Sequence, residues 1–236
     1  MRRQKLSEEV RRQILDMIRS GTIAPGESLP SERELMERLG VGRPAIREAM
    51  QSLETIGLIE IRHGGRARVS EPSIGRMVEQ IGETMKHLLA NSPASLENLK
   101  EARATFEREL ARIAARKRSA TDIERLTEIL ADQTLAIDDR PRFRALDGAF
   151  HREIANISGN PIFSALIDAL FRWLADFHAD LVSVPGLEQL TLAEHRLILT
   201  AITRSDAEEA GTAMGDHLMR ANDLYRQSNL ARVPVA

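Results

Sequence analysis

Apolar residues change their pattern once along this chain, near Pro72, and that change limits the folds open to it. Upstream, three short segments with helical spacing are followed by a stretch in which apolar and polar residues alternate, as in a β-hairpin. Downstream, the helical spacing continues almost to the end and no strand pattern occurs. Because 236 residues are enough for two ordinary domains, we expect a mainly α-helical protein with one domain at 1–75 and another at 76–236.

The first 75 residues predict a complete small domain of three helices and a hairpin. Ser7 is a candidate N-cap for the first helix, and Ser31 with Glu34 forms a capping box at the second. Gly40 ends the second helix, and Pro44 suits the first turn of the third. The helices are expected at 6–18, 31–40 and 43–57, and the hairpin has Ile59 and Ile61 before its turn and Ala67 and Val69 after it.

After Pro72 the sequence predicts an all-helical bundle of six or seven helices. Thr121 with Glu124 and Ser205 with Glu208 have the spacing of capping boxes and mark two of the helix starts. The helices are expected at 77–89, 96–115, 121–137, 143–157, 162–182, 187–203 and 205–227.

The composition excludes several classes of protein. The chain has no cysteine, which rules out a disulfide framework and thiolate metal sites and fits a reducing compartment. Aromatic residues make up 3%, too few for a platform on which single-stranded nucleic acid stacks. There is no signal-peptide core, and no apolar run approaches the ~18 residues of a membrane span. We therefore expect a soluble cytoplasmic protein without a membrane partner.

The third predicted helix has two different faces. Arg43, Arg47 and Gln51 follow one another at intervals of four on a polar face, and Arg33 stands at the start of the preceding helix. This layout is typical of a helix-turn-helix, whose second helix places its first turn in the major groove of double-stranded DNA. Arginine can bind guanine through two hydrogen bonds or hold a phosphate. The opposite face is apolar and is expected to pack inward, with Ala45, Ile46, Ala49, Met50 and Leu53.

The predicted hairpin turn is basic and contains two glycines, which allow a backbone to approach a groove closely. Residues 1–75 hold 13 Lys and Arg against 11 Asp and Glu, so the domain is slightly basic in a chain of net charge −2. The alternative is an ordinary solvated surface, which accounts for any single arginine but poorly for the whole arrangement. The residues of the turn and its flanks are Arg62, His63, Gly64, Gly65, Arg66 and Arg68.

Five polar residues interrupt the apolar stripes of the predicted bundle. They are Asp147 and His151, four apart on one helix, His195 and His217 on two later helices, and Arg103. Each must find a partner in the core, because an unpaired buried polar group costs about 1–3 kcal/mol. A metal would satisfy the imidazoles and the carboxylate together, and the arginine suggests an anion beside it. Hydrogen-bonded core histidines are the alternative, and the spacing alone does not separate the two.

The stretch IAPGESLPSERELMERLGVGRPAIREAMQSLETIGLIEIRHGGRARV resembles the winged helix-turn-helix of the GntR superfamily of bacterial transcription regulators. The resemblance rests on the PG-x-x-LPSEREL run, the REA helix, the GLI strand and the glycine-rich wing. Gly42 departs from the many members that have serine there, and the GRP-x-x-REA form is similar to the NanR-like, sialic-acid-responsive branch. The resemblance implies that Arg33, Arg43 and Arg47 contact the operator. It also implies that the wing enters the minor groove with His63, Gly64, Gly65 and Arg66.

The second domain is similar to the FCD domain, the ligand-binding half of FadR-type regulators. Its pattern, D-x-x-x-H, then EH, then a histidine in the last helix, is matched by Asp147, His151, His195 and His217. The resemblance implies a divalent metal at these residues and a small organic acid or sugar acid over it, with Arg103 as the partner of this anionic effector. Zinc fits nitrogen and oxygen ligands, and nickel or manganese are alternatives.

We therefore interpret the chain as a ligand-controlled transcription regulator, more narrowly a repressor, that binds its operator as a homodimer. A metal-dependent hydrolase built on the bundle is the alternative, since an open metal site can activate water. It would leave the helix-turn-helix idle, and Glu194, which points away from its neighbour His195, is a poor general base. An architectural DNA-binding protein would leave the polar cluster unexplained. We accordingly expect no enzyme activity.

Overall fold

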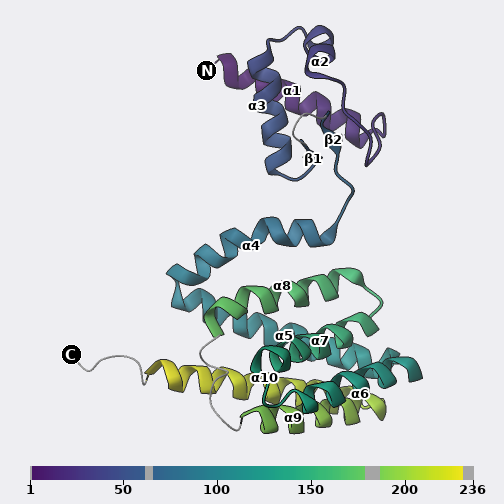
Figure 1. Cartoon of the computed structure of the whole chain (residues 1–236), viewed down its shortest axis with the longest axis vertical. Coiled ribbons are helices and arrows are strands. Elements are labelled where there is room, and N and C mark those ends of the chain that lie inside the picture. The colour runs from purple at the N-terminus through teal and green to yellow at the C-terminus, as the bar shows by residue number, and fades with distance from the viewer. Residues whose placement is uncertain (1, 62–65, 179–186, 231–236) are drawn as a thin grey trace, which may run out of the picture. The chain divides into compact units, whose positions relative to one another are not determined.

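The computed structural model describes residues 2–61, 66–178 and 187–230 and confirms the mainly α-helical fold class (Figure 1). Its contacts divide the chain into two compact units, Met1–Gln80 and Ile81–Ala236. The domain boundary that the sequence predicts, between 75 and 76, falls inside the helix α4 (Ile74–Asn91). Among the helices within the described ranges, none has both the length and the apolar composition that crossing a membrane requires.

The first unit contains the helices α1 (Arg2–Arg19), α2 (Glu32–Leu39) and α3 (Arg43–Thr55). Ser31 and Glu34 form the predicted capping box of α2, in which each side chain accepts a hydrogen bond from the backbone N–H of the other residue. Gly40 ends α2 with a φ of 64°, a left-handed conformation that glycine adopts without strain. The turn from α2 into α3 is therefore as the sequence predicts.

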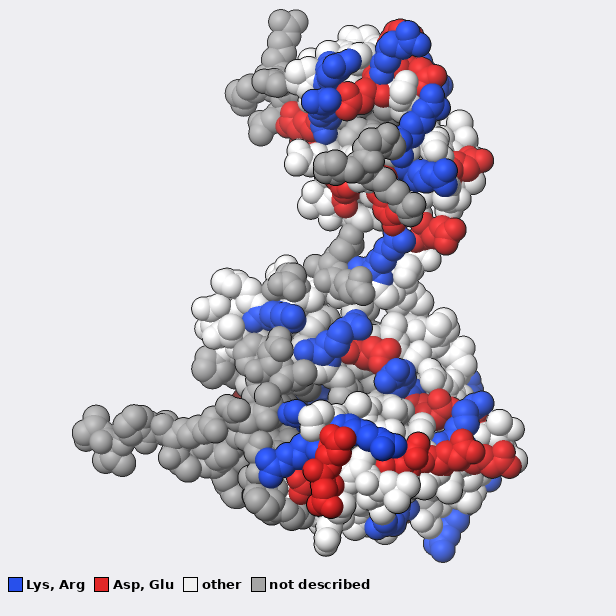
Figure 2. All heavy atoms as spheres, viewed as in Figure 1, with Lys and Arg blue, Asp and Glu red and all other residues white. Residues whose placement is uncertain are grey.

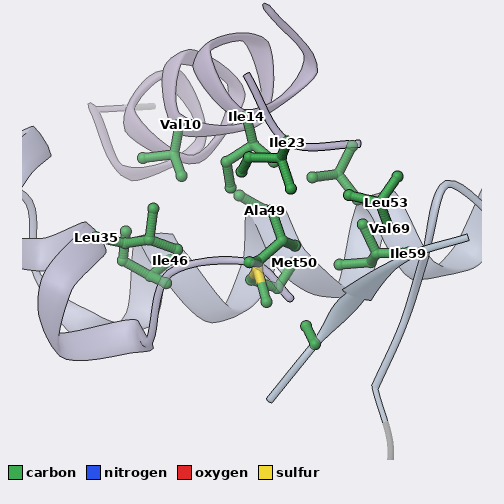
Figure 3. Close-up of a cluster of buried hydrophobic side chains, with 12 residues drawn as sticks. Val10, Ile14, Ile23, Leu35, Ile46, Ala49, Met50, Leu53, Ile59 and Val69 are labelled. Carbon is green, nitrogen blue, oxygen red and sulfur yellow. The ribbon is translucent and has the colours of Figure 1, made fainter. Parts of the chain in front are cut away.

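The core of the first unit lies where α1 and α3 face each other, with α2 and the hairpin at its ends (Figure 3). Val10 and Ile14 of α1 and Leu53 of α3 have no exposed surface. Ser7 lies on the same face of α1 as Val10 and Ile14 and is buried as well, so the predicted N-cap at Ser7 is wrong, because α1 begins at Arg2. The apolar face predicted for α3 is buried in full, which leaves the opposite face to solvent.

A small sheet completes the first unit. The strands β1 (Ile59–Glu60) and β2 (Arg68–Val69) pair antiparallel, with Ile59 opposite Val69 and Glu60 opposite Arg68. The sequence did not predict a third partner, but Ser28 forms a bridge with Arg68. Ile61 lies beyond β1 and is exposed. The predicted turn at His63, Gly64 and Gly65 lies outside the described residues.

The second unit contains only helices among its described residues. After α4, the helices are α5 (Pro93–Lys117), α6 (Ala120–Leu135), α7 (Arg140–Ile157), α8 (Pro161–His178), α9 (Leu187–Thr203) and α10 (Ala207–Leu230). α10 packs against α5 and α9, and α6 packs against α7 and α9. The helices α5 and α10 come close together, since a Cβ added at Gly211 of α10 would lie 2.7 Å from Nε of Arg112 on α5.

The start of α6 differs from the prediction. Ser119 caps the helix and forms a reciprocal capping box with Asp122, whereas the sequence predicted Thr121 with Glu124. Both pairs have the required spacing. The chain uses the earlier pair, so Thr121 lies inside the helix.

The start of α10 also differs, by a shift in the opposite direction. The Asp206 carboxylate accepts a hydrogen bond from the backbone N–H of Glu209 at 3.0 Å, so Asp206 takes the capping role predicted for Ser205. Ser205 has a φ of 59° and lies before the helix. The left-handed turn at Ser205 moves the first helical residue to Ala207.

We predict that Leu53→Ala destabilises the first unit by about 2–5 kcal/mol, because it removes a fully buried side chain and leaves a cavity. Hydrogen exchange of the α3 amides in the full chain measures this. Ile56→Ala is the matched control, since Ile56 follows α3 and is 46% exposed. Equal losses in the two variants would contradict the assignment of Leu53 to the core.

Candidate functional site

The structure brings together the four residues that the sequence predicts as metal ligands. Asp147 and His151 come from α7, His195 from α9 and His217 from α10, and one ligand atom of each lies within 4.8 Å of all the others. The three histidines are buried and Asp147 is partly buried. The centroid of the His195 ring lies 4.8 Å from that of His217 and 5.4 Å from that of His151. Three helices therefore converge on one polar cluster inside the bundle.

Each of the three imidazoles is held at Nδ1 by a different polar side chain. Glu107 of α5 accepts a hydrogen bond from Nδ1 of His151. The Gln133 amide oxygen on α6 accepts from Nδ1 of His195 at 2.9 Å, and Glu194 Oε2 on α9 accepts from Nδ1 of His217 at 2.7 Å. The Phe150 ring also stacks on His195, with the ring centroids 4.3 Å apart. These contacts fix which ring nitrogen faces the cluster.

The sequence did not predict these three partners. Glu194 was expected only as a poor general base beside His195, whereas its side chain reaches His217 on the next helix. Gln133 interrupts a buried stripe that includes Leu126 and Leu130, which is the same signal that identified the histidines. Glu107 lies four residues after Arg103 on α5, so the stripe of that helix also contained the signal.

The other nitrogen of the histidine rings, Nε2, indicates what the cluster can bind. Nε2 of His151 and Nε2 of His195 are buried, and neither has a hydrogen-bond partner among the described residues. Nε2 of His195 lies 3.4 Å from Oδ1 of Asp147. Unpaired nitrogen acceptors are costly in a core unless something binds to them. Three imidazoles and one carboxylate are a donor set that fits a divalent transition metal.

Burial keeps two of the histidines in the neutral form that binds metals. It lowers the pKa of His195 well below 6.5, and the nearby His217 and His151 lower it further. Burial also lowers the pKa of His217, although the hydrogen bond to Glu194 opposes this effect. For Glu107, burial raises the carboxyl pKa, but the charge of Arg103 and the hydrogen bonds from His151 and Arg103 outweigh it and bring the pKa to about 2. Glu107 is therefore an ionised carboxylate at neutral pH.

Two arginines extend the cluster outward. Nε of Arg103, the residue predicted to contact the effector, donates to Oε1 of Glu107 at 2.5 Å, and its guanidinium lies 4.3 Å from the centroid of the Phe171 ring. Arg220, which the sequence analysis did not identify, forms an ion pair with Glu194 on α9. Each arginine thus reaches a histidine through a glutamate.

The predicted DNA-contacting residues of the first unit lie on its exposed surface. Nε of Arg47 donates to Oε1 of Glu32 at 3.0 Å, and Nε of Arg43 lies 3.5 Å from Oε2 of the same carboxylate. Their side chains are 66% and 60% exposed. Arg33 is exposed on α2, 3.9 Å from Glu37, and Arg66 is exposed beside the hairpin. His63, Gly64 and Gly65 lie outside the described residues.

Glu32 is a further residue of this surface that the sequence analysis did not single out. Lys and Arg alternate with Asp and Glu on the visible face of the first unit, so its charge is mixed (Figure 2). A hollow of about 440 Å³ adjoins Arg47 and runs between α3 and the hairpin. Glu32, Arg47, Gln51 and Arg66 contribute polar groups to its lining. The surface thus offers hydrogen-bond donors and acceptors beside a concave feature.

We predict that the metal-free second unit loses stability as the pH falls below about 6.5. His195 and His217 stay neutral when folded but take up protons when unfolded, because their pKa values are lowered only in the fold. The loss reaches at most about 1.4 kcal/mol per pH unit for each proton. Glu107 adds to it only below pH 4.5, its ordinary pKa. Chemical denaturation in a chelator at a series of pH values measures the effect, and unchanged stability between about pH 7 and 5.5 would contradict it.

Comparisons with known proteins assign both halves of the chain. Residues 6–69 match the family of bacterial regulatory proteins named gntR, and residues 98–220 match the FCD domain. The transcriptional repressor NanR of Cronobacter sakazakii is 39% identical over 221 residues, which cover 92% of this chain and 84% of that protein. NanR of Salmonella typhimurium is 38% identical, with 92% and 82% covered.

Solved structures agree with this assignment. The GntR protein of Streptococcus agalactiae has a TM-score of 0.62 and 25% identity, and the match covers 94% of this chain and 99% of that one. McbR/YncC of E. coli shares the fold, with a TM-score of 0.54. The relatives are regulators, so the hydrolase alternative is excluded and the protein is not an enzyme. The chain belongs to the gntR family of bacterial transcription regulators and carries an FCD domain in its C-terminal half.

Proposed function

We propose that this regulator is a repressor that binds a specific operator as a homodimer and senses a small organic acid or sugar acid over a divalent metal. The observation that carries the sensing half of the proposal is the pair of buried Nε2 atoms of His151 and His195, which have no hydrogen bond and lie in the cluster with Asp147. The related NanR proteins are named repressors, which supports the sign of regulation. Zinc suits the donor set, with nickel or manganese as alternatives.

The recognition surface supports direct reading of bases by Arg47. Its hydrogen bonds to described residues run through Nε, so Glu32 orients the side chain from one edge of the guanidinium. The opposite edge carries the two Nη groups, the pair that binds O6 and N7 of guanine. Arg43, one turn earlier, shares the same carboxylate. Arg33, Arg66 and the wing at His63, Gly64 and Gly65 complete the proposed contact surface, with phosphates and the minor groove as their targets.

The ligand set supports a sensing role in the second unit. Asp147, His151, His195 and His217 would hold the metal, which supplies a Lewis-acidic point for an oxygen of the effector. Arg103 is the proposed anion partner, because its guanidinium lies one glutamate away from His151 and is 14% exposed. An effector changes repression only by binding two conformations with different affinity. Two copies of the chain would present two recognition helices to one operator, which raises the modest affinity of a single domain.

For the DNA surface, we predict that Arg47→Ala weakens binding to the operator by about 1–3 kcal/mol and has little effect on random duplex DNA. A duplex selected from a random pool by the wild-type protein serves as the operator in fluorescence anisotropy. Arg12→Ala is the matched control, because Arg12 is 64% exposed and, like Arg47, is paired with a glutamate. Equal losses on both duplexes would make Arg47 a phosphate contact, and no loss would remove it from the surface.

For the metal, we predict one divalent ion per chain, with at least a tenfold loss of affinity in His151→Ala and in His217→Ala. Each substitution removes one imidazole ligand from the cluster. Elemental analysis after dialysis against zinc, nickel or manganese measures the content. His87→Ala is the control, since His87 is exposed on α4. A metal-free wild-type protein, or full retention in both variants, would show that the cluster is a hydrogen-bonded polar core.

A further inference from the structure

We propose that Glu107, Gln133 and Glu194 are positioning residues of the metal centre, each of which presents one histidine to the ion. The inference rests on the proposed metal site and adds to it the reason why the imidazoles are ready to bind. Each of the three side chains contacts Nδ1 of one ring and lies on a different helix from that ring, α5, α6 or α9. None of the three is among the four ligands.

The hydrogen bonds determine which nitrogen of each ring has a free lone pair. The carboxylates of Glu107 and Glu194 each pair with an arginine and accept a hydrogen bond from Nδ1, so the proton of a neutral imidazole is on Nδ1. Nε2 is then unprotonated and can donate its lone pair to a metal. The amide oxygen of Gln133 sets the same arrangement for His195. Outer partners of this kind orient metal-binding histidines and raise their basicity.

The three positioning residues differ in charge, and the two charged ones each have a compensating partner. Glu107 is paired with Arg103 and Glu194 with Arg220, so each carboxylate has a cation beside it. Such a partner is needed because a buried carboxylate without a compensating cation is strongly disfavoured. Gln133 is fully buried and uncharged, so its amide oxygen accepts from His195 without needing a cation beside it.

The arrangement gives Arg103 a second task. It is the proposed partner of the anionic effector, and it also holds the carboxylate that orients His151. An anion that binds Arg103 thus affects the contacts from Arg103 through Glu107 to His151, and the metal binds at the end of the same series. By reciprocity, an effector that changes the affinity for the metal must have its own affinity changed by the metal by the same factor.

The test measures zinc affinity of the full chain by competition with a chromophoric chelator, after all metal has been removed by dialysis. Glu107→Gln and Glu194→Gln keep the shape but remove the charge, and we expect each to weaken zinc binding about 10–100-fold. Glu107→Ala should weaken it more, because glutamine can still accept from Nδ1. Glu109→Gln is the matched control on α5: Glu109 is 57% exposed, pairs with Arg112, and should leave the affinity unchanged within about twofold.

The melting temperature of each metal-free variant separates positioning from a purely structural role. A fall in metal-free stability with unchanged zinc affinity would overturn the proposal while the metal site stands. Absence of zinc binding in the wild-type protein would overturn the metal site itself, and the positioning role with it. If Glu107→Gln does not fold, Glu194→Gln decides, because Glu194 is 17% exposed and its substitution disturbs the core less.

Discussion

Three imidazoles buried in an apolar bundle are the constraint on which the second unit depends. Each ring has two nitrogens, and both need a partner because water does not reach them. The chain itself supplies a hydrogen-bond acceptor for one nitrogen of each ring, Nδ1, from side chains on α5, α6 and α9. The rings come from α7, α9 and α10. Hydrogen bonds therefore hold five of the helices in register. A helix that slides along its axis breaks the hydrogen bonds in which it takes part.

The sequence predicts the four residues of the polar cluster but not the side chains that contact their rings, and the difference has a physical cause. A histidine in an apolar stripe is conspicuous, and Asp147 lies one turn before His151, so periodicity finds the inner residues. Glu107 and Glu194 lie on helices where charged residues are frequent, and their partners are 44 and 23 residues away in the chain. Periodicity states which way a side chain faces along its own helix. It does not state which helix lies opposite.

Predictions of helix ends from local sequence were right where the sequence offers one candidate cap and wrong where it offers two. Gly40 has a left-handed φ, and the box of Ser31 and Glu34 is reciprocal, so the turn before the recognition helix was predictable. At the start of α6, both Ser119 with Asp122 and Thr121 with Glu124 have capping-box spacing. The structure uses the first pair, and the sequence predicted the second. The hairpin shows a different limit. Ser28, which forms a β-bridge with Arg68 of the second strand, lies forty residues upstream in a loop with no strand pattern.

The pairing of the Ser28 segment with β2 has a consequence for the behaviour of the protein in concentrated solution. β2 has β1 on one side and the Ser28 segment on the other, and Val69 exchanges backbone hydrogen bonds with Gly26 and Glu27. Its backbone groups are thus occupied on both sides. An open strand edge invites pairing with a strand of another molecule, and two copies on one operator would meet at high local concentration. Because the loop covers this edge of the hairpin, neighbouring copies have no free edge of β2 on which to aggregate.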